Sequence, residues 1–160
     1  MAGKGSLRVS GKNSVSGIKK TYHLGLDSRV MEGAKIALLP GDPDRVPSLA
    51  HTAPIEEARE IAWKREYRTW LGHVAKRRIL VTSTGIGGPS ASIAMDELAQ
   101  LGVTTFIRVG TTGAIQPNIK LGDVIITSGA VRLDGASTHY APLEYPAVAH
   151  HEIIDALVEA

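Results

Sequence analysis

Cysteine is absent from the 160 residues, and aromatic side chains make up only 4% of them. Without cysteine the chain has no disulfide, no thiolate metal site and no thiol nucleophile, which fits a reducing compartment and predicts a cytoplasmic protein. No apolar run approaches the roughly 18 residues of a transmembrane helix, so no membrane partner is expected. So few aromatic residues offer no base-stacking platform, and nucleic acid is not expected as a partner.

Two further site classes are missing at the level of motifs. The six histidines show no helical pair with an accompanying carboxylate, so a zinc centre is not expected. No Gly-x-Ser-x-Gly elbow is present, which argues against a hydrolase of that type.

Acidic residues are missing from the first 21 residues, which carry five basic side chains and a charge of +5. The remaining 13 basic and 16 acidic residues give −3, so the net charge of +2 comes from this leader. Organelle transit peptides and nucleic-acid tails share such a composition, but this leader has no apolar face for a transit helix. We therefore predict that residues 1–21 are a basic, disordered extension and that one domain occupies residues 22–160.

The first half of this domain predicts a strand, a short helix and a hairpin. Residues 35–39 form an apolar run typical of a buried strand, and Asp42 or Asp44 is placed to cap the helix that follows. Charged residues at helical spacing favour a helix in the segment that begins at Ile55. Residues 67–74 alternate as a strand does and are expected to pair with residues 78–84.

The second half gives a clearer pattern. A buried strand and a glycine-rich turn lead into a helix from Pro89 or Ser90, which stops at Gly102 before a strand over residues 104–109. Strand, helix and strand in this order predict parallel pairing. Another strand is expected over residues 123–127, and apolar spacing predicts a final amphipathic helix. The fold class is therefore α/β, with a mixed central sheet flanked by helices.

Three glycine-containing turns each follow a predicted strand. The first contains Gly41 and Arg45, the second spans residues 85–90, and the third spans residues 110–113 directly after Arg108. Glycines allow a ligand to approach backbone N–H groups, and arginine presents a planar fork of donors to phosphate. Because ligands of α/β sheets bind beyond the carboxyl ends of the strands, the three turns together predict a pocket for a dianion.

Each turn also has a purely structural explanation. The 85–90 turn matches neither the dinucleotide fingerprint nor the P-loop, and it is explained equally well as a tight strand-to-helix connection. Arg45 can pair with Asp42 or Asp44. Arg108, expected to be buried within its strand, can pair with a distant carboxylate. From the residues alone, the prediction reaches a phosphate-binding α/β protein and no further.

Six segments carry a resemblance that goes beyond this. They are "YHLGL", "LLPGDPDR", "KREYRTW", "STGIGGPSASIAMDELAQLG", "IRVGTTGAIQPNIKLGDVIIT" and "VRLDGAS". In this order they resemble the nucleoside phosphorylase family from Tyr22 to the end, and the first and last are most similar to its uridine branch. The resemblance implies a pentosyltransferase of nucleoside catabolism and pyrimidine salvage. In that reaction uridine and inorganic phosphate give uracil and ribose 1-phosphate, without an organic cofactor.

The resemblance also implies which residues hold the phosphate co-substrate. Arg45 and Arg108 are the implied catalytic pair, and the phosphate binders are Gly41, Arg45, Arg108 and Thr111. A further phosphate ligand, Arg65, is implied to come from a neighbouring subunit, so the expected partner is a second copy, in a dimer or a hexamer.

Roles at the nucleoside and at a cation follow in the same way. His23 resembles the residue that reaches across the dimer to the ribose 5′-hydroxyl of a neighbouring subunit's site, and Thr112 and Gly113 match positions lining the nucleoside pocket. Glu66, Ile86 and Ser90 match a monovalent-cation site at the dimer interface, where potassium is expected.

Part of the family's site has no counterpart in this sequence. The uracil-recognising Gln-x-Arg and the ribose-binding Met-Glu pair of the family lie beyond the point matching Ala160. We therefore interpret residues 22–160 as the N-terminal part of a nucleoside phosphorylase domain, truncated at its C-terminus. Three hypotheses follow: a shortened member of the uridine branch, a non-catalytic binder of phosphate or nucleosides, or a partner of full-length subunits in mixed hexamers. A purine-directed phosphorylase is the second alternative for the activity.

Overall fold

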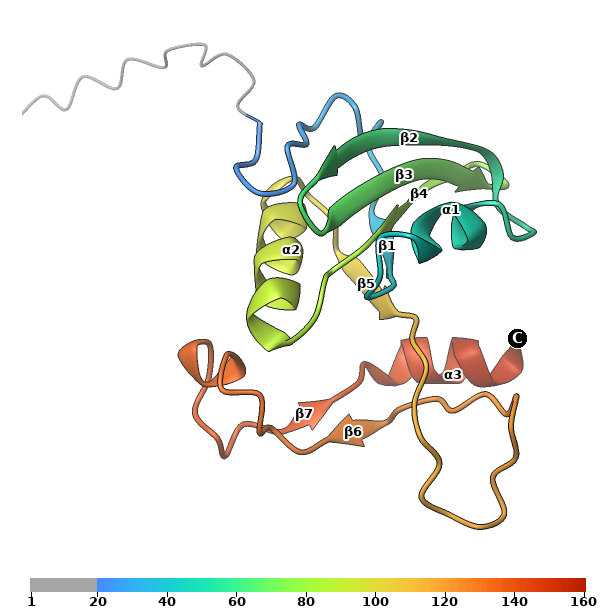
Figure 1. Ribbon diagram of the computed structural model, residues 1–160, viewed down its shortest axis with the longest axis vertical. Coiled ribbons are helices and arrows are strands. Elements are labelled where there is room, and N and C mark those ends of the chain that lie inside the picture. The colour runs from blue at the N-terminus through green and yellow to red at the C-terminus, as the bar shows by residue number, and fades with distance from the viewer. Residues whose placement is uncertain (1–19) are drawn as a thin grey trace, which may run out of the picture.

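The computed structural model describes residues 20–160, so the predicted extension lies almost wholly outside the described residues. The core of the protein contains β1 (Ile36–Leu39), α1 (Arg45–Ala50), β2 (Glu56–Lys64), β3 (Tyr67–Val74), β4 (Arg77–Thr82), α2 (Gly88–Gln100) and β5 (Thr105–Arg108) (Figure 1). After it come β6 (Gly129–Ala130), the 3-10 helix η1 (Ser137–His139), β7 (Ala147–Val148) and α3 (His151–Glu159). None of the helices within residues 20–160 combines the length and hydrophobicity that crossing a membrane requires.

A mixed five-stranded sheet organises the core, with strand order β2-β3-β4-β1-β5. Strand β1 is parallel to both β4 and β5, whereas β3 is antiparallel to β2 and β4. The predicted α/β class with a mixed sheet is confirmed. The β4–α2–β5 unit is parallel as expected, with β1 inserted between its two strands.

The two helices of the core cover opposite faces of this sheet (Figure 1). Ala37 and Leu39 of β1 belong to the same buried cluster as Ala94 and Leu98 of α2. Leu38, which points to the other face because side chains alternate along a strand, packs with Val46, Ala50 and Val81 on the α1 side. Strand β1 lies inside the sheet, with Ala37 and Leu39 buried and Ile36 and Leu38 half-buried, which explains why it is apolar throughout.

One predicted helix is a strand. The charged segment that begins at Ile55 forms β2 at the edge of the sheet, where Glu60 lies opposite Trp70 and Trp63 lies opposite Arg68. Its charges serve cross-strand contacts, because Arg68 Nε donates to Glu60 Oε2 at 2.7 Å. Charges on an edge strand discourage pairing with other chains, so the same pattern fits a solvated edge as well as a helix.

A second correction concerns residues 123–127, which form no strand. No strand of the described chain pairs with them, and a strand needs a partner for its backbone groups. The predicted cap of α1 is also wrong in detail. Asp44 occupies the N-cap without a side-chain hydrogen bond to the helix, and Asp42 Oδ1 accepts a bond from Asp44 N at 2.9 Å in the preceding turn.

Within the segment after β5, Arg132 ties together residues 132–145. Its guanidinium donates to Ser137 Oγ and to the carbonyl oxygens of Ser137, Ala141, Pro142 and Tyr145. Tyr140 Oη donates to Asp96 Oδ2 at 2.7 Å, which ties the η1 region to α2. The predicted final helix is confirmed as α3, which begins at His151.

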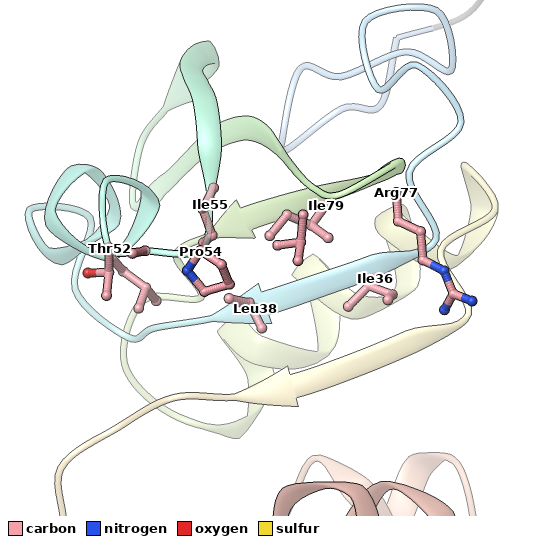
Figure 2. Close-up of a pocket in the computed structure, with 10 residues that line it drawn as sticks. Ile36, Leu38, Thr52, Pro54, Ile55, Arg77 and Ile79 are labelled. Atoms are coloured by element: carbon pink, nitrogen blue, oxygen red, sulfur yellow. The ribbon is translucent and has the colours of Figure 1, made fainter. Parts of the chain in front are cut away.

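An apolar hollow of about 380 Å³ lies on the α1 face of the sheet. Figure 2 shows Ile36, Leu38 and Ile79 forming its floor and Arg77 at one end. Residues 52–55, between α1 and β2, form the opposite side. The sheet is thus incompletely covered on this face.

Candidate functional site

The loops after β1, β4 and β5 meet at one end of the sheet, as the strand order requires. Thr84 N donates to Pro40 O and Gly85 N donates to Gly41 O, both at 2.9 Å. On the other side of β1, Val109 N donates to Leu39 O at 3.1 Å. Carboxyl ends of parallel strands form the usual ligand-binding edge of an α/β sheet. The structure therefore brings together the beginnings of all three predicted turns.

Arg108 is exposed, contrary to the expectation of a buried guanidinium. It is the last residue of β5, which is an edge strand, so its side chain leaves the sheet where the strand ends. Its Nη1 donates to Leu39 O and to Val109 O, each at 2.7 Å. These neutral acceptors fix the guanidinium without neutralising its charge. Among residues 20–160 no carboxylate lies within ion-pair distance of Arg108.

Two glycines make room for this guanidinium. A Cβ added to Gly41 would lie 3.2 Å from Arg108 Nη2, and one added to Gly110 would lie 3.3 Å from Arg108 Cζ. Both distances are tighter than ordinary van der Waals contact, so side chains at these positions would push Arg108 aside. Gly41, Gly110 and Arg108 therefore form one fixed positive patch.

The other predicted phosphate binders, Arg45 and Thr111, lie at the start of α1 and in the loop after β5. Arg45 opens α1 and is half-buried, and within the described chain no acid lies at ion-pair distance from it, so the pairing with Asp42 or Asp44 is not found. Thr111 and Thr112 are exposed and make no side-chain hydrogen bond within residues 20–160. A Cβ added to Gly113 would have no atom within 4 Å, so this loop lies open to solvent.

The start of α2 is shared with an acidic side chain. A Cβ at Gly88 would lie 3.2 Å from both Cβ and Oδ1 of Asp134. Hydrogen bonds from the backbone and side chain of Ser137 hold the pKa of Asp134 below its ordinary value. With a carboxylate beside its first turn, α2 does not offer the open anion site considered for the 85–90 turn. The anion patch is confined to the ends of β1 and β5.

Glu66 and Ser90, two of the predicted cation ligands, come together behind Gly85. Ser90 Oγ lies 3.3 Å from Glu66 Oε1 and donates to Thr84 O at 2.5 Å. Tyr67 Oη lies 3.2 Å from Ser90 Oγ. A Cβ at Gly85, where φ is +70°, would lie 2.7 Å from Ser90 Oγ, so glycine is required for this approach. Hydrogen bonds from the backbone N–H of Glu66 itself and from the Ser90 hydroxyl lower the pKa of the Glu66 carboxyl.

Ile86, the remaining residue of that set, and Arg65, which precedes Glu66 in the chain, both face solvent. Ile86, the third predicted ligand, has a fully exposed side chain. Arg65 lies in the tight turn between β2 and β3 with φ of +57°, and its side chain is exposed. Arg65 is therefore free to reach outward from the turn.

His23 lies at the opposite end of α2 from the anion patch. Its Nδ1 is 2.8 Å from Glu97 Oε1, and Glu97 is nine residues beyond Gly88, roughly 14 Å along the helix. Figure 1 shows the segment that begins at residue 20 passing the C-terminal end of α2. His23 and Arg108 of one chain are not brought together.

Sequence reasoning missed Glu97 and the carbonyls that orient Arg108. Glu97 is buried, and it receives hydrogen bonds from three N–H groups of His23 and Leu24. A signal was present: Glu97 adjoins Leu98 and follows Ala94 by three residues, so it falls on the apolar face of the helix. A carboxylate on an apolar helix face needs hydrogen-bond partners when it is buried, so this position could have identified Glu97 as a residue with a specific contact.

Comparison with known proteins bears directly on this arrangement. The family model described as "Phosphorylase superfamily" matches residues 35–160, which include every strand and helix of the structure. The chain belongs to the phosphorylase superfamily. The predicted family is thereby confirmed, and the five-stranded mixed sheet agrees with its fold.

Relatives within the superfamily carry two kinds of name. Uridine phosphorylase of Escherichia coli is 55% identical over 139 residues, covering 87% of this chain and 54% of the relative. Uridine phosphorylase of Thermococcus kodakarensis is 58% identical over 127 residues, covering 79% and 45%. Guanosine phosphorylase of Halorubrum lacusprofundi is 40% identical over 126 residues, covering 79% and 52%. The chain spans about half the length of the curated relatives it matches.

Proposed function

We propose that this chain carries the phosphate-binding half of a uridine phosphorylase, which converts uridine and phosphate to uracil and ribose 1-phosphate. The observation that carries the proposal is Arg108, held by two carbonyls beside Gly41 and Gly110, with no carboxylate partner in the described chain. An oriented, uncompensated guanidinium is suited to an anionic ligand. The names and identities of the similar proteins support uridine as the nucleoside.

The proposed chemistry uses the arginines as fixed positive charge. Arg45 and Arg108 hold phosphate, with Thr111 and Gly41 completing its contacts, so that one phosphate oxygen faces the anomeric carbon. That oxygen forms the new C–O bond as the C–N bond to uracil breaks, and the bonding electrons leave with the base, which then takes a proton. Because arginine stays protonated, orientation and charge stabilisation are what these residues supply.

A second copy of the chain completes the proposed site. Arg65 is exposed in the turn between β2 and β3, and His23 lies at the far end of α2 from the anion patch of its own chain. We propose that they reach the phosphate and the ribose of a neighbouring subunit, in a dimer that assembles further into a hexamer. Thr112 and Gly113, exposed on the loop after β5, would line the nucleoside pocket.

A potassium ion is proposed beside this interface. The carboxylate of Glu66 and the hydroxyl of Ser90 lie 3.3 Å apart, and such oxygen ligands suit a hard cation. Two side chains make an incomplete shell, which the Ile86 backbone and a second copy would extend. The ion would supply structural charge balance at the interface, and no chemical step depends on it.

A non-catalytic role is the second candidate, because the patch formed by Arg108, Gly41 and Gly110 is by itself suited to binding an anion. A chain with the anion patch alone would bind phosphate without turning over uridine, or would join longer subunits. A purine-directed phosphorylase has weaker support, from the guanosine phosphorylase at 40% identity.

One assay separates these functions. The 160-residue chain is incubated with uridine, with and without inorganic phosphate, and uracil release is followed. Release only with phosphate is the result expected of uridine phosphorylase. No release, combined with thermal stabilisation by phosphate, is the result expected if these 160 residues carry the anion patch without the rest of the site. Release from inosine or guanosine in place of uridine would establish the purine-directed alternative.

A further inference from the structure

Residues 21–26, here called the N-terminal hook, fold back on themselves before β1. Thr21 N donates to Leu26 O at 2.7 Å, Gly25 N donates to Thr21 O at 3.2 Å, and Leu26 N donates to Thr21 Oγ1 at 3.1 Å. Leu24 and Leu26 are completely buried in the cluster beneath α2. The backbone that carries His23 is therefore fixed by closure of the hook and by its apolar anchors.

A single buried carboxylate receives the donors of this hook. Glu97 Oε1 accepts from His23 N at 2.9 Å and lies 2.8 Å from His23 Nδ1, and Oε2 accepts from Leu24 N at 2.8 Å. Glu97 is only 8% exposed, so water does not replace these partners. A carboxylate in such surroundings persists because its oxygens are satisfied by N–H groups.

The contact with Nδ1 determines which ring nitrogen is left for other partners. An ionised carboxylate can only accept hydrogen bonds, so Nδ1 must carry the proton in the 2.8 Å contact. In a neutral imidazole the lone pair then lies on Nε2. The His23 side chain remains 31% exposed, which leaves part of the ring open to an incoming group.

We propose that Glu97 is a positioning residue for His23: its carboxylate holds the Nδ1–H tautomer and so presents Nε2 as a hydrogen-bond acceptor to the substrate hydroxyl in a neighbouring site. The target at the ribose rests on the proposed function, whereas the tautomer and the orientation rest on the contacts within this chain. A carboxylate that orients a histidine through its second nitrogen is a general device for controlling imidazole chemistry.

The variant Glu97→Gln tests this at constant size. Its amide has one oxygen and one NH₂ group, so it can no longer accept from both the Leu24 N–H and the His23 Nδ1–H. Either the Leu24 contact is lost, or the NH₂ group faces Nδ1 and favours the opposite tautomer. Asp96→Asn is the matched control, since it removes one charge from the next residue of α2, and Asp96 is exposed and bonded to Tyr140.

The first readout is the tautomer of His23, measured by long-range nitrogen–proton NMR of the full chain at a pH where imidazole is neutral. The wild type and Asp96→Asn are expected to show protonated Nδ1 in about tenfold excess, the bias given by a charge-assisted hydrogen bond. Glu97→Gln should lose that excess. Equal tautomers in the wild type, or an unchanged excess in Glu97→Gln, would overturn the proposal without any assay of activity.

The second readout compares uridine with 5′-deoxyuridine, which lacks the proposed hydroxyl partner. Glu97→Gln should lower the uridine preference in kcat/KM by about tenfold, the cost of one such hydrogen bond, and Asp96→Asn should retain it. A changed tautomer with an unchanged preference would uphold Glu97 as the residue that orients His23. The same result would contradict the proposed role of His23 at the ribose, so the two failures are distinguishable.

Discussion

At the scale of single residues, Arg108 shows how the end of a strand creates a site. The run around it is apolar and predicts burial, yet the residue sits at the end of a four-residue edge strand and points out of the sheet. Its anchors are backbone carbonyls of β1 and of the next residue. Such anchors depend on strand order, which residue types do not encode locally. The position of Arg108 in a strand could be predicted from the sequence, but its exposure and its hydrogen bonds to the two carbonyls could not.

Arg108→Ala is expected to abolish stabilisation by phosphate. Phosphate at a hundred times its Kd stabilises a folded protein by about 2.7 kcal/mol, and without the guanidinium that gain should vanish. The loss of two bonds to backbone carbonyls should cost about 1 kcal/mol in phosphate-free buffer. Thermal unfolding with and without phosphate measures both effects.

The control for this prediction is Arg77→Ala, the same substitution at the other end of the sheet. Arg77 opens β4 and is exposed, so its variant should keep the full response to phosphate. Equal stabilisation of the wild type and Arg108→Ala by phosphate would remove Arg108 from the proposed site.

Glu97 makes a separate prediction about pH. Burial by itself raises the pKa of Glu97, but hydrogen bonds from Leu24 and His23 outweigh burial and lower it from 4.5. A folded-state pKa below the unfolded value stabilises the protein above about pH 4.5, and this contribution is lost as the pH falls through the folded-state pKa. The stability difference between the wild type and Glu97→Gln should therefore shrink below pH 4.5. Urea titrations at several pH values measure it, and a difference that grows on acidification would contradict the assignment.

At the scale of elements, the patterns that could be predicted are those set by burial. The apolar strands β1 and β4, and α2 with its glycine stop at Gly102, lie close to where the sequence predicts them. Strand β2 does not follow from its pattern, because its charges are explained by partners distant in sequence, such as Glu32, which accepts from Arg59 at 2.5 Å. Residues 123–127 have strand-forming side chains but no strand beside them. Propensity without a partner does not make a strand.

Packing between β2 and β3 gives an element-scale prediction at Gly72. A Cβ there would lie 2.7 Å from Ile55 Cγ2 and 3.2 Å from Glu56 O, closer than atoms can approach without a shift. Gly72→Ala should therefore destabilise the fold by about 1–3 kcal/mol, the usual cost of overpacking. Gly113→Ala, with nothing within 4 Å of its added Cβ, should change stability by less than about 0.5 kcal/mol. Chemical denaturation of both variants checks this, and equal stabilities would show that the sheet accommodates the methyl group freely.

At the scale of the whole molecule, the distribution of apolar surface is uneven. The core around β1 is closed on the α2 side, while the α1 side keeps the hollow of about 380 Å³ shown in Figure 2. Beyond β5, large apolar side chains such as Ile115, Leu121 and Val131 are exposed. The curated relatives are nearly twice as long as the matched region. Apolar surface that is not covered within the described residues favours self-association of the chain.

The chain by itself is therefore expected to associate and to bind a hydrophobic dye. Large exposed apolar side chains favour contacts between copies, so sedimentation should give a mass above 17.0 kDa that rises with concentration. The double variant Leu121→Ser with Val124→Ser removes two exposed apolar side chains outside the sheet, so it should lower both dye fluorescence and association while leaving the melting temperature within a few degrees. Unchanged association in this variant would assign the contact to the hollow or to the free edge of β5. A monomer that binds no dye would mean that the apolar segment after β5 is covered in solution.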